Sequence, residues 1–340
     1  MPRGGATIAT IAKEVGVSVP TVSRVLNGRS DVAPATRRRV EEALARHDYR
    51  KPVGASSPTK ADGLLDLVFH EFGSAWAQEI IVGVEKAAAP RGVGVVLSEL
   101  GGSHRPPQEW IDSITSRGTR GVLLVLSRLD DTQQRQLTAR SIPFVVLDTD
   151  GETPAGVPTV GSNNWSGALS ATRHLIELGH RRIAVISGPE AVLCSRARVD
   201  GFRSAHGESD LEVDPSLVKW GTFEVAAGYE HGLDLLGRPD RPTAVFAGSD
   251  SQALGLIRAA HELGLRVPAD LSIVGYDDLP LASWLAPSLT TVRQPLSEMA
   301  ALATQMLITL SDGGTLASQK VELGTELIVR ESTAPPAMQR

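Results

Sequence analysis

The sequence predicts an α/β protein in which a small all-α helix-turn-helix headpiece at the N-terminus precedes two Rossmann-like parallel-sheet subdomains. From about residue 62 onward, short apolar segments alternate with amphipathic segments, which is typical of doubly wound sheets with helices on both faces. With 340 residues, the chain exceeds the size of one hydrophobic core, and the alternating part alone exceeds one sheet unit. We therefore expect two core subdomains with a ligand cleft between them.

Charge is distributed unevenly along the chain. The formal net charge is −5, yet residues 1–60 contain 11 Lys and Arg against 5 Asp and Glu, which leaves −11 for the other 280 residues. A basic segment in front of an acidic body is typical of a nucleic-acid-binding domain joined to a second domain. On charge alone, a solvated basic surface would explain the segment equally well.

Composition indicates the compartment. Cys194 is the single cysteine, so the chain has no internal disulfide framework, which fits a reducing environment. No apolar run reaches 18 residues, and the first residues lack the apolar stretch of a signal peptide. We expect a cytoplasmic protein, nucleoid-associated through DNA and without a membrane partner.

The first 28 residues have the pattern of two short helices joined by a tight turn. Thr7 can cap a helix over residues 8–15, and Gly16 permits the backbone conformation of the turn. Ser18 can cap the second helix, which we expect to run to about Asn27. Apolar residues recur at helical spacing in both segments, so the two helices can bury one face against each other.

The outward positions of the second helix carry mostly small or polar side chains. Short hydroxyl side chains can donate to phosphates and let a helix sit deep in the major groove of DNA. Arg24 can donate twice to a guanine edge, and Val19 can contact a thymine methyl. A third helix, from Pro34 to near Tyr49, completes a three-helix headpiece.

Seven apolar runs are expected to be buried strands of the core, and four amphipathic segments are expected to be helices between them. The strands are expected at 64–69, 93–98, 121–126, 142–148, 182–188, 243–248 and 271–278, and the helices at 74–92, 164–180, 223–238 and 250–265. Strands and helices in this alternation predict parallel sheets, which bind ligands beyond the carboxyl ends of their strands.

Polar side chains follow the ends of several of these strands: Asp148, Ser187, Ser249, Asp250, Asp277 and Asp278. An ionised carboxylate can accept from two vicinal sugar hydroxyls at once. Arg198 comes soon after one strand and offers a fork of donors to the same region. A strand-end acid can instead cap the following helix, but the recurrence of such residues favours a ligand site.

The segment TIATIAKEVGVSVPTVSRVLNGRSDVAPATRRRVEEALARHDYR resembles the headpiece of the lactose repressor (LacI) family of transcriptional regulators, of the LacI/GalR type. The segments HLIELGHRRIAVISGP, AVFAGSDSQALG and VPADLSIVGYDDLPLASWLAPSLTTVRQP resemble that family's regulatory core, which has the periplasmic-binding-protein-like fold. The resemblance implies a homodimer that binds near-palindromic, double-stranded operator DNA. By position, it assigns DNA contacts to Thr7, Ser18, Val19, Pro20, Thr21, Ser23, Arg24 and Asn27.

The same resemblance implies an effector site between the two core subdomains. By position, the hydroxyl-binding residues are Asp148, Arg198, Asp250 and Asp277, and Phe223 stands where an aromatic ring stacks on a sugar. Ser249 replaces an Asn that many members carry, and Trp76 and Trp284 are candidates either for further stacking platforms or for the core. The expected domains are the headpiece at 1–50, a hinge or linker at 51–62, a first subdomain at 63–160 plus about 292–318, and a second at 161–291 plus about 319–335.

Residues 51–62 depart from the family pattern. Members usually carry an Ala-Arg-Ser-Leu run, which forms a hinge helix whose Leu enters the minor groove. Here Ser56 and Pro58 stand at the Arg and Leu positions, and Pro52, Gly54 and Pro58 oppose a stable helix. We expect a linker, with a hinge helix as the alternative.

The predicted function is repression of carbohydrate uptake or catabolism genes, relieved when a sugar or oligosaccharide effector binds between the subdomains. Residues 67–85 are similar to the same part of xylo-oligosaccharide-responsive members. The alternative is a corepressor response, in which a nucleobase or sugar phosphate tightens DNA binding. The motifs G-x-S-x-G, H-E-x-x-H and G-K-[ST] are missing, and the 8 His are scattered. We expect no catalytic residue, metal or cofactor, and a sugar-processing enzyme fused to a DNA-binding headpiece is the least favoured class.

Overall fold

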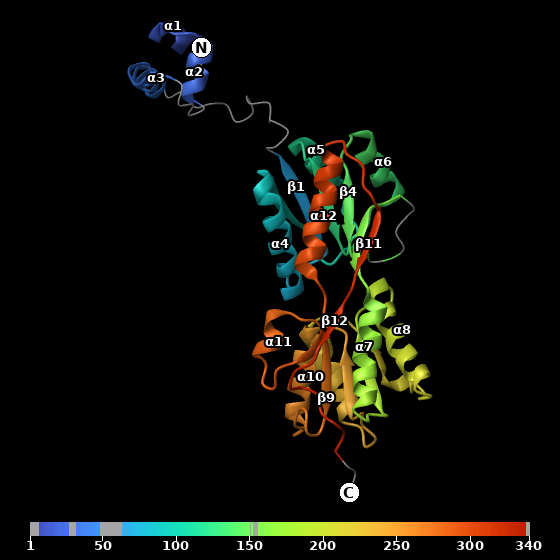
Figure 1. Ribbon diagram of the computed structural model, residues 1–340. Helices are drawn as coiled ribbons and strands as arrows, with labels where there is room; N and C mark the ends of the chain where they lie inside the picture. The colour runs from blue at the N-terminus through green and yellow to red at the C-terminus, as the bar shows by residue number, and fades with distance from the viewer. Residues whose placement is uncertain (1–6, 27–31, 48–62, 150, 152–155, 338–340) are drawn as a thin grey trace. The chain divides into compact units, whose positions relative to one another are not determined.

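The structure is a computed structural model that describes residues 7–26, 32–47, 63–149, 151 and 156–337. The chain divides into two compact units, Met1–Thr59 and Lys60–Arg340, which we call the headpiece and the core and describe separately (Figure 1). Three sequence expectations, on Asn27, Tyr49 and the linker at 51–62, lie outside the described residues.

The headpiece contains α1 (Ile8–Val15), α2 (Val19–Leu26) and α3 (Pro34–Arg46). Thr7 caps α1, because its side chain accepts a hydrogen bond from the backbone N–H of Thr10 at 3.3 Å. Gly16 ends α1 with a φ of 70°, a left-handed conformation that glycine adopts without steric cost. At the start of α2, Ser18 Oγ accepts from the backbone N–H of Thr21 at 3.3 Å. The predicted helix-turn-helix is confirmed, and its helix ends lie within one residue of those expected.

One apolar cluster holds the three headpiece helices together: Ile11, Ala12, Val15, Val22, Val25, Val40 and Ala43. Full burial of a Val or Ile side chain stabilises a fold by about 1.5–3 kcal/mol. Burial of this cluster therefore stabilises the packing of α1, α2 and α3 against one another. Polar contacts join α1 to α3 as well. Glu14 pairs with Arg46 at 3.0 Å, and the Arg39 guanidinium donates to the carbonyl of Val15.

The core consists of two lobes, each built on one sheet (Figure 1). In the first lobe, the strand order is β11-β5-β4-β3-β1-β2, with β1 (Leu64–Phe69), β2 (Gly94–Glu99), β3 (Gly121–Val125), β4 (Phe144–Leu147), β5 (Thr159–Ser162) and β11 (Lys320–Leu323). The strand pairings described for this sheet are parallel. One face is covered by α4 (Ala75–Ala88) and α12 (Leu296–Ser311), and the other by α5 (Gln108–Arg117) and α6 (Asp131–Ala139). The short 3-10 helix η1 (Ala89–Arg91) follows α4.

In the second lobe, the strand order is β12-β10-β9-β8-β6-β7, with β6 (Ile183–Ser187), β7 (Val218–Trp220), β8 (Ala244–Ala247), β9 (Ser272–Asp277), β10 (Thr290–Arg293) and β12 (Glu326–Ile328). The described pairings are parallel except that of β10 with β12. One face is covered by α7 (Asn164–Glu177) and α8 (Leu193–Glu208), and the other by α9 (Val225–Leu236) and α10 (Asp250–Glu262). The connections also contain η2 (Pro215–Leu217) and α11 (Pro280–Trp284).

Within the described residues, the chain passes between the lobes after β5, after β10 and after β11. These crossings lie a few residues later than the subdomain limits expected from the sequence. The limits at 160/161 and 291/292 fall inside β5 and β10, each of which stays whole in one sheet. β11 belongs to the first lobe, although 319–335 was assigned to the second, because it pairs with β5 in parallel register from Lys320 to Leu323.

The predicted fold class is confirmed: two parallel-dominant α/β sheets follow a helical headpiece. The seven strands and four helices expected in the core are present, and β5, β7, β10, β11 and β12 are additional. In the part of the chain that the structure describes, no helix has the length and apolar character needed to cross a membrane.

Two glycines allow α9 and α10 to approach closely. A Cβ on Gly255 of α10 would lie 2.0 Å from the carbonyl oxygen of Val225 in α9. A Cβ on Gly228 of α9 would lie 2.0 Å from the carbonyl oxygen of Gln252 in α10. Both obstacles are backbone atoms, so neither can rotate aside as a side chain can.

Gly255→Ala is expected to destabilise the core by about 1–3 kcal/mol, because overpacking outweighs a gain in helix propensity of about 1 kcal/mol. Gly207→Ala in α8 is the matched control, since a Cβ at Gly207 meets nothing within 4 Å. The control should be neutral or stabilising. Urea unfolding followed by circular dichroism measures both variants, and equal stability would contradict the close approach of α9 and α10.

Candidate functional site

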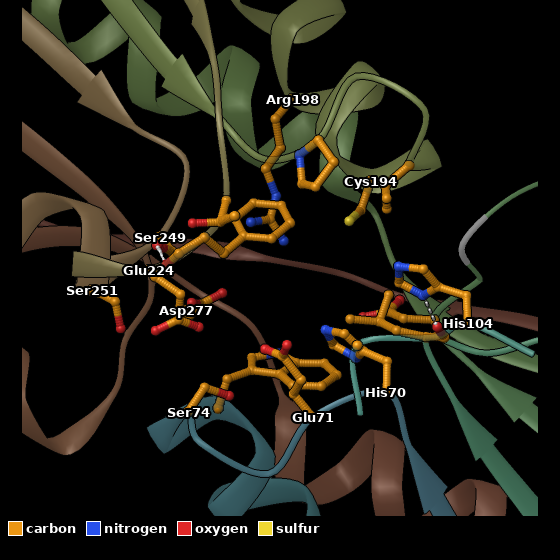
Figure 2. Close-up of a pocket in the computed structure, with 18 residues that line it drawn as sticks. His70, Glu71, Ser74, His104, Cys194, Arg198, Glu224, Ser249, Ser251 and Asp277 are labelled. Carbon is orange, nitrogen blue, oxygen red and sulfur yellow. Dashed lines mark hydrogen bonds between the residues drawn. The ribbon is translucent and has the colours of Figure 1, made fainter. Parts of the chain in front are cut away.

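A cavity of about 290 Å³ lies between the two lobes of the core (Figure 2). The first lobe contributes His70, Glu71, Ser74, Trp76, Gly102, His104, Leu126 and Asp148 to its lining, and the second lobe contributes Pro189, Val192, Cys194, Arg198, Thr222, Phe223, Glu224, Ser249, Ser251 and Asp277. Many of these residues follow a strand or lie in the first turns of a helix, which is where parallel sheets bind ligands. The expectation of a cleft between two subdomains is therefore met.

Three lining residues have backbone conformations that side chains rarely adopt. Leu126 after β3 and Asp148 after β4 have φ angles of 47° and 48°, and Asp277 at the end of β9 has a φ of 112°. Such conformations cost roughly 1–3 kcal/mol each and persist only where the surroundings enforce them. Two of the three residues are carboxyls of the cavity, so unusual backbone conformations place both Asp148 and Asp277 in the lining.

Arg198 of α8 is the buried cation of the cavity, with 4% of its surface exposed. Its guanidinium carbon lies 3.8 Å from the centroid of the Tyr276 ring and 5.1 Å from that of the Phe223 ring. Nε donates to Asn164 Oδ1 at 2.9 Å, and Nη1 donates to the carbonyl of Gly248. Contacts on its faces and edges fix the plane of the guanidinium, so it is preorganised as a planar donor.

Two buried carboxyls, one from each lobe, lie near this cation. Burial raises the pKa of Asp148 to about 6, and the charge of Arg198 opposes the rise. Burial raises the pKa of Asp277 to about 7, opposed by Arg198 and by a hydrogen bond from Gln294. Both carboxyls therefore titrate close to neutral pH, and each can accept a hydrogen bond from a ligand hydroxyl in its ionised form.

Glu71 and Glu224 add two further carboxyls, again one from each lobe. Burial raises the pKa of Glu224, and the charge of Glu71 raises it further. The described lining thus contains four Asp and Glu but a single Arg and no Lys. Many acceptors around one planar donor suit a neutral ligand that is rich in hydroxyls, and they oppose an anionic ligand.

Phe223 forms one wall of the cavity, and its position depends on a glycine. A Cβ on Gly188, directly after β6, would lie 2.2 Å from the Phe223 ring, so only glycine leaves room for it. Ser249 Oγ donates to the carbonyl of Phe223 at 2.7 Å and accepts from the backbone N–H of Gln252 at 3.0 Å. Ser249 therefore holds the Phe223 loop against the start of α10. The ring presents an apolar surface beside fixed acceptors.

Two histidines line the first-lobe side of the cavity. The rings of His70 and His104 stack with centroids 4.9 Å apart and an interplanar angle of 16°. His104 Nδ1 lies 2.5 Å from the carbonyl of Leu126, and because a carbonyl only accepts, this nitrogen carries the proton. Among the described residues, no group of three or more His, Cys, Asp and Glu is arranged to hold a metal ion.

Six of the eight effector-site residues expected from the sequence line the cavity: Trp76, Asp148, Arg198, Phe223, Ser249 and Asp277. Asp250 lies outside the lining and is fully buried. Its carboxylate accepts from the backbone N–H of Leu279 at 2.7 Å and from Thr291 Oγ1 at 2.6 Å, so it joins α10 to the second sheet. Trp284 in α11 also lies outside the lining and is 86% exposed.

The sequence reasoning missed other residues of the lining, including His70, Glu71, Ser74, His104, Cys194, Glu224 and Ser251. His70 and Glu71 directly follow β1, so the rule that parallel sheets bind ligands beyond the carboxyl ends of their strands, which we call the strand-end rule, could have found them. Ser251 lies one position beyond Asp250 in the first turn of α10, and the helical phase turns Ser251 toward the cavity instead. His104 lies in a loop between β2 and α5, where no sequence signal marks it.

Seven of the eight expected DNA contacts lie in the described headpiece: Thr7, Ser18, Val19, Pro20, Thr21, Ser23 and Arg24. Val19 is 39% exposed although it is apolar, and Pro20 and Arg24 are exposed beside it. Thr21 and Ser23 are half-buried on the same helix. The outer face of α2 therefore combines an apolar start with hydroxyl groups and one guanidinium.

Two family models match the chain. A model described as bacterial regulatory proteins, lacI family, matches residues 7–51, and a model of a periplasmic binding protein-like domain matches residues 172–333. The first covers the headpiece helices and the second covers most of the second lobe.

Curated relatives match almost the full length. The HTH-type transcriptional repressor PurR of Klebsiella pneumoniae (strain 342) is 35% identical over 335 residues, which are 97% of each chain. The HTH-type transcriptional repressor CytR of Escherichia coli (strain K12) is 34% identical over 331 residues, which are 96% of each chain.

Solved structures are similar over the same length. A complex of the transcriptional regulator CelR with cellobiose is 34% identical with a TM-score of 0.71, and the match covers 96% of this chain and 99% of that one. The lac repressor dimer bound to operator and the anti-inducer ONPF is 26% identical with a TM-score of 0.77, covering 97% of this chain and 100% of that one.

The raised pKa of Asp277 predicts a pH-dependent stability. A carboxyl whose pKa rises on folding, here from 3.8 to about 7, contributes stability below the unfolded value and loses it as the pH rises through the folded value. We expect Asp277→Asn to gain stability relative to wild type as the pH is raised from about 4 to about 8. The gain should be on the order of a few kcal/mol, since one pKa unit corresponds to about 1.4 kcal/mol. Urea unfolding at several pH values measures it.

Asp270→Asn is the control, because folding lowers the pKa of Asp270 whereas it raises that of Asp277. A hydrogen bond from the Arg266 side chain lowers the pKa of Asp270 to about 2, so its contribution is present above pH 3.8 and is lost as the pH falls toward 2. A stability difference between wild type and Asp277→Asn that stays constant with pH would contradict the raised pKa of Asp277.

Proposed function

Since the chain belongs to the lacI family of bacterial regulatory proteins, we propose that it is a transcriptional repressor that binds operator DNA through its headpiece and releases it when a sugar binds between the core lobes. Relatives that match almost its full length are HTH-type transcriptional repressors, which are not enzymes. The observation that carries the effector assignment is the cavity, where carboxyls from both lobes surround one fixed guanidinium.

The composition of α2 supports separate sets of residues for base contacts and for phosphate contacts. Val19 and Pro20 have no side-chain donor or acceptor, so base selection at the start of the helix rests on apolar contact and shape. Arg24, one turn further along, can donate twice to a guanine edge. The hydroxyls of Ser18, Thr21 and Ser23 are suited to phosphates.

A homodimer fits this mode of binding. The lac repressor in the operator complex is a dimer, and the present chain matches it over 97% of its residues. Two copies of α2 would read two half-sites about 34–36 Å apart, so the operator is expected to be near-palindromic.

The cavity supports a neutral sugar as the effector. Four carboxyls can accept from hydroxyls, Arg198 can donate, and Phe223 and Trp76 offer ring surfaces. The volume of about 290 Å³ is at the lower end of small-molecule sites, which span about 300–1,000 Å³, so one or two sugar units fit best. CelR was solved with cellobiose, a disaccharide of β-linked pyranoses, and xylo-oligosaccharides have the same linkage. We therefore propose a β-linked disaccharide, and genes of carbohydrate uptake or catabolism as the targets.

The contacts suggest how binding is coupled to DNA release. A ligand in the cavity meets Glu71 and Asp148 of the first lobe and Arg198 and Asp277 of the second. Joining both lobes changes their relative orientation, and operator half-sites at fixed spacing then match less well. A coupling of about 1–3 kcal/mol is sufficient. A nucleobase or sugar-phosphate corepressor would instead tighten DNA binding, and the four carboxyls oppose a phosphate.

Arg24→Ala is expected to weaken specific operator binding by about 1–3 kcal/mol and to relax base preference at one position per half-site. Fluorescence anisotropy with operator duplexes that carry single base changes measures both effects. Lys13→Ala, an exposed substitution on α1, is the control and should not change base preference. Unchanged affinity and preference in Arg24→Ala would show that α2 does not read the bases as proposed.

Cellobiose is expected to raise the melting temperature of the wild-type protein and to weaken its operator binding, because a ligand that binds the folded state stabilises it. Arg198→Met should bind the operator but lose both responses, since removal of the planar donor leaves ligand hydroxyls without a partner. Arg196→Met is the matched control, because Arg196 is exposed on the same helix. Tighter operator binding in the presence of a ligand would favour the corepressor, and a normal response of Arg198→Met would exclude Arg198 as an effector contact.

A further inference from the structure

Ser162 is the last residue of β5 and lies where the chain first passes from the first lobe to the second. It is 6% exposed and does not belong to the lining of the effector cavity. Its carbonyl and its hydroxyl nevertheless each lead, through one amide side chain, to a different charged group of that cavity. We call these hydrogen bonds the Ser162 network.

The backbone N–H of Ser162 lies on the side of the Asp148 carboxylate and lowers the pKa of Asp148 against the effect of burial. Asp148 directly follows β4, which pairs with β5. Its own N–H donates to the carbonyl of Val160 at 2.9 Å, so its backbone is attached to β5. The residue that supplies the first-lobe carboxylate is therefore held, through its backbone, by the strand that leads into the first crossing.

The carbonyl of Ser162 leads to the guanidinium of Arg198. It accepts from Asn164 Nδ2 at 3.0 Å, and Asn164 Oδ1 accepts from Arg198 Nε at 2.9 Å. Because the carbonyl only accepts and the guanidinium only donates, the orientation of the Asn164 amide is fixed. Asn164 is the first residue of α7, so this connection passes into the second lobe.

The hydroxyl of Ser162 leads to Asp277. It donates to Gln294 Oε1 at 2.5 Å, and Gln294 Nε2 donates to Asp277 Oδ1 at 2.6 Å. Gln294 is 4% exposed and follows β10, where the chain returns to the first lobe. The Ser162–Gln294 bond therefore joins the first and second crossings, and the carboxylate at its far end faces the effector.

We propose that Ser162 is the positioning residue that couples occupancy of the effector cavity to the arrangement of the two lobes. This inference rests on the proposed function. An effector that forms a hydrogen bond with Asp277 or Arg198 weakens the bond of that residue to Gln294 or Asn164. Both amide side chains are bonded to Ser162, so either change alters the hydrogen bonds of Ser162 between the lobes. Buried hydrogen bonds in such a chain strengthen one another, so the network responds as a unit. The crossings after β5 and after β10 are the part of the core whose conformation differs with and without effector in this proposal.

The network differs from ordinary capping bonds at strand ends. The bonds of Asp250 join α10 to Thr291 of β10 and to Leu279, which follows β9, so neither bond involves a strand of the first sheet. The Ser162 network joins β5 of the first sheet to Asp277 at the end of β9 and to Gln294 directly after β10 of the second. Loss of the Ser162 hydroxyl should therefore reduce the effect of the sugar on operator binding more than it changes the affinity for the sugar or for the operator alone.

Ser162→Ala in the full-length chain tests the proposal. Cellobiose affinity by calorimetry and operator affinity without sugar should each stay within about threefold of wild type. The factor by which saturating cellobiose weakens operator binding should fall at least about fivefold, the lower limit of typical allosteric coupling. Gln294→Ala should show the same loss of coupling, and the double variant should lose no more than either single variant, because both remove one connection.

Thr172→Val is the matched control. Thr172 is buried like Ser162, but its hydroxyl donates to the carbonyl of Ala168 within α7, so the bond does not leave one helix. Wild-type coupling in Ser162→Ala would overturn the proposal. An equal loss of coupling in Thr172→Val would overturn it too, since the effect would then follow from any buried hydroxyl.

A measurement without sugar separates this inference from the proposed function. If wild type does not respond to cellobiose, the effector assignment fails, while NMR titration of the Asp277 carboxyl still tests the network. Ser162→Ala should raise the pKa of Asp277, because Gln294 is no longer held in place to donate, whereas Arg198 and Asp148, which also act on Asp277, remain. An Asp277 titration that is the same in Ser162→Ala, Thr172→Val and wild type would overturn the network.

Discussion

The polar contacts between the two lobes are organised around one buried guanidinium that cannot lose its charge. Taking an Arg side chain out of water costs several kcal/mol unless charges and acceptors replace the solvent. Arg198 meets this requirement with the rings of Tyr276 and Phe223, the oxygen of Asn164 and the nearby carboxyls of both lobes. Because these groups come from two different sheets, compensation of the charge requires the lobes to meet at one place. The effector cavity is the space left within this polar junction.

The headpiece could be predicted nearly residue by residue because its signals are local. A cap at Thr7, a left-handed turn at Gly16 and apolar spacing along α1 each act within a few residues of sequence. The buried strands were equally visible, since parallel strands covered on both faces are continuous apolar runs. β5 and β11 were not visible, because each has four residues and partly polar composition. Their place depends on pairing between segments about 160 residues apart.

The strand-end rule found Asp148 and Asp277 but could not separate Asp250 from its neighbour, because the phase of α10 decides which side chain faces the cavity. Trp284 was named for its ring alone, and the ring turned out to be exposed. Ser162 could not be found from the sequence, since serines at strand ends are common. Its role is defined by Gln294, 132 positions later in the chain, and only the folded crossings bring the two together.

The wall of the effector cavity also contains the chain's single thiol, that of Cys194. Burial raises its pKa to about 11, so at neutral pH almost none of it is thiolate, the form that reacts with alkylating agents and oxidants. The chain's one thiol is therefore a poor nucleophile while it is buried in the folded core, and its reaction with an alkylating agent is expected to be slow.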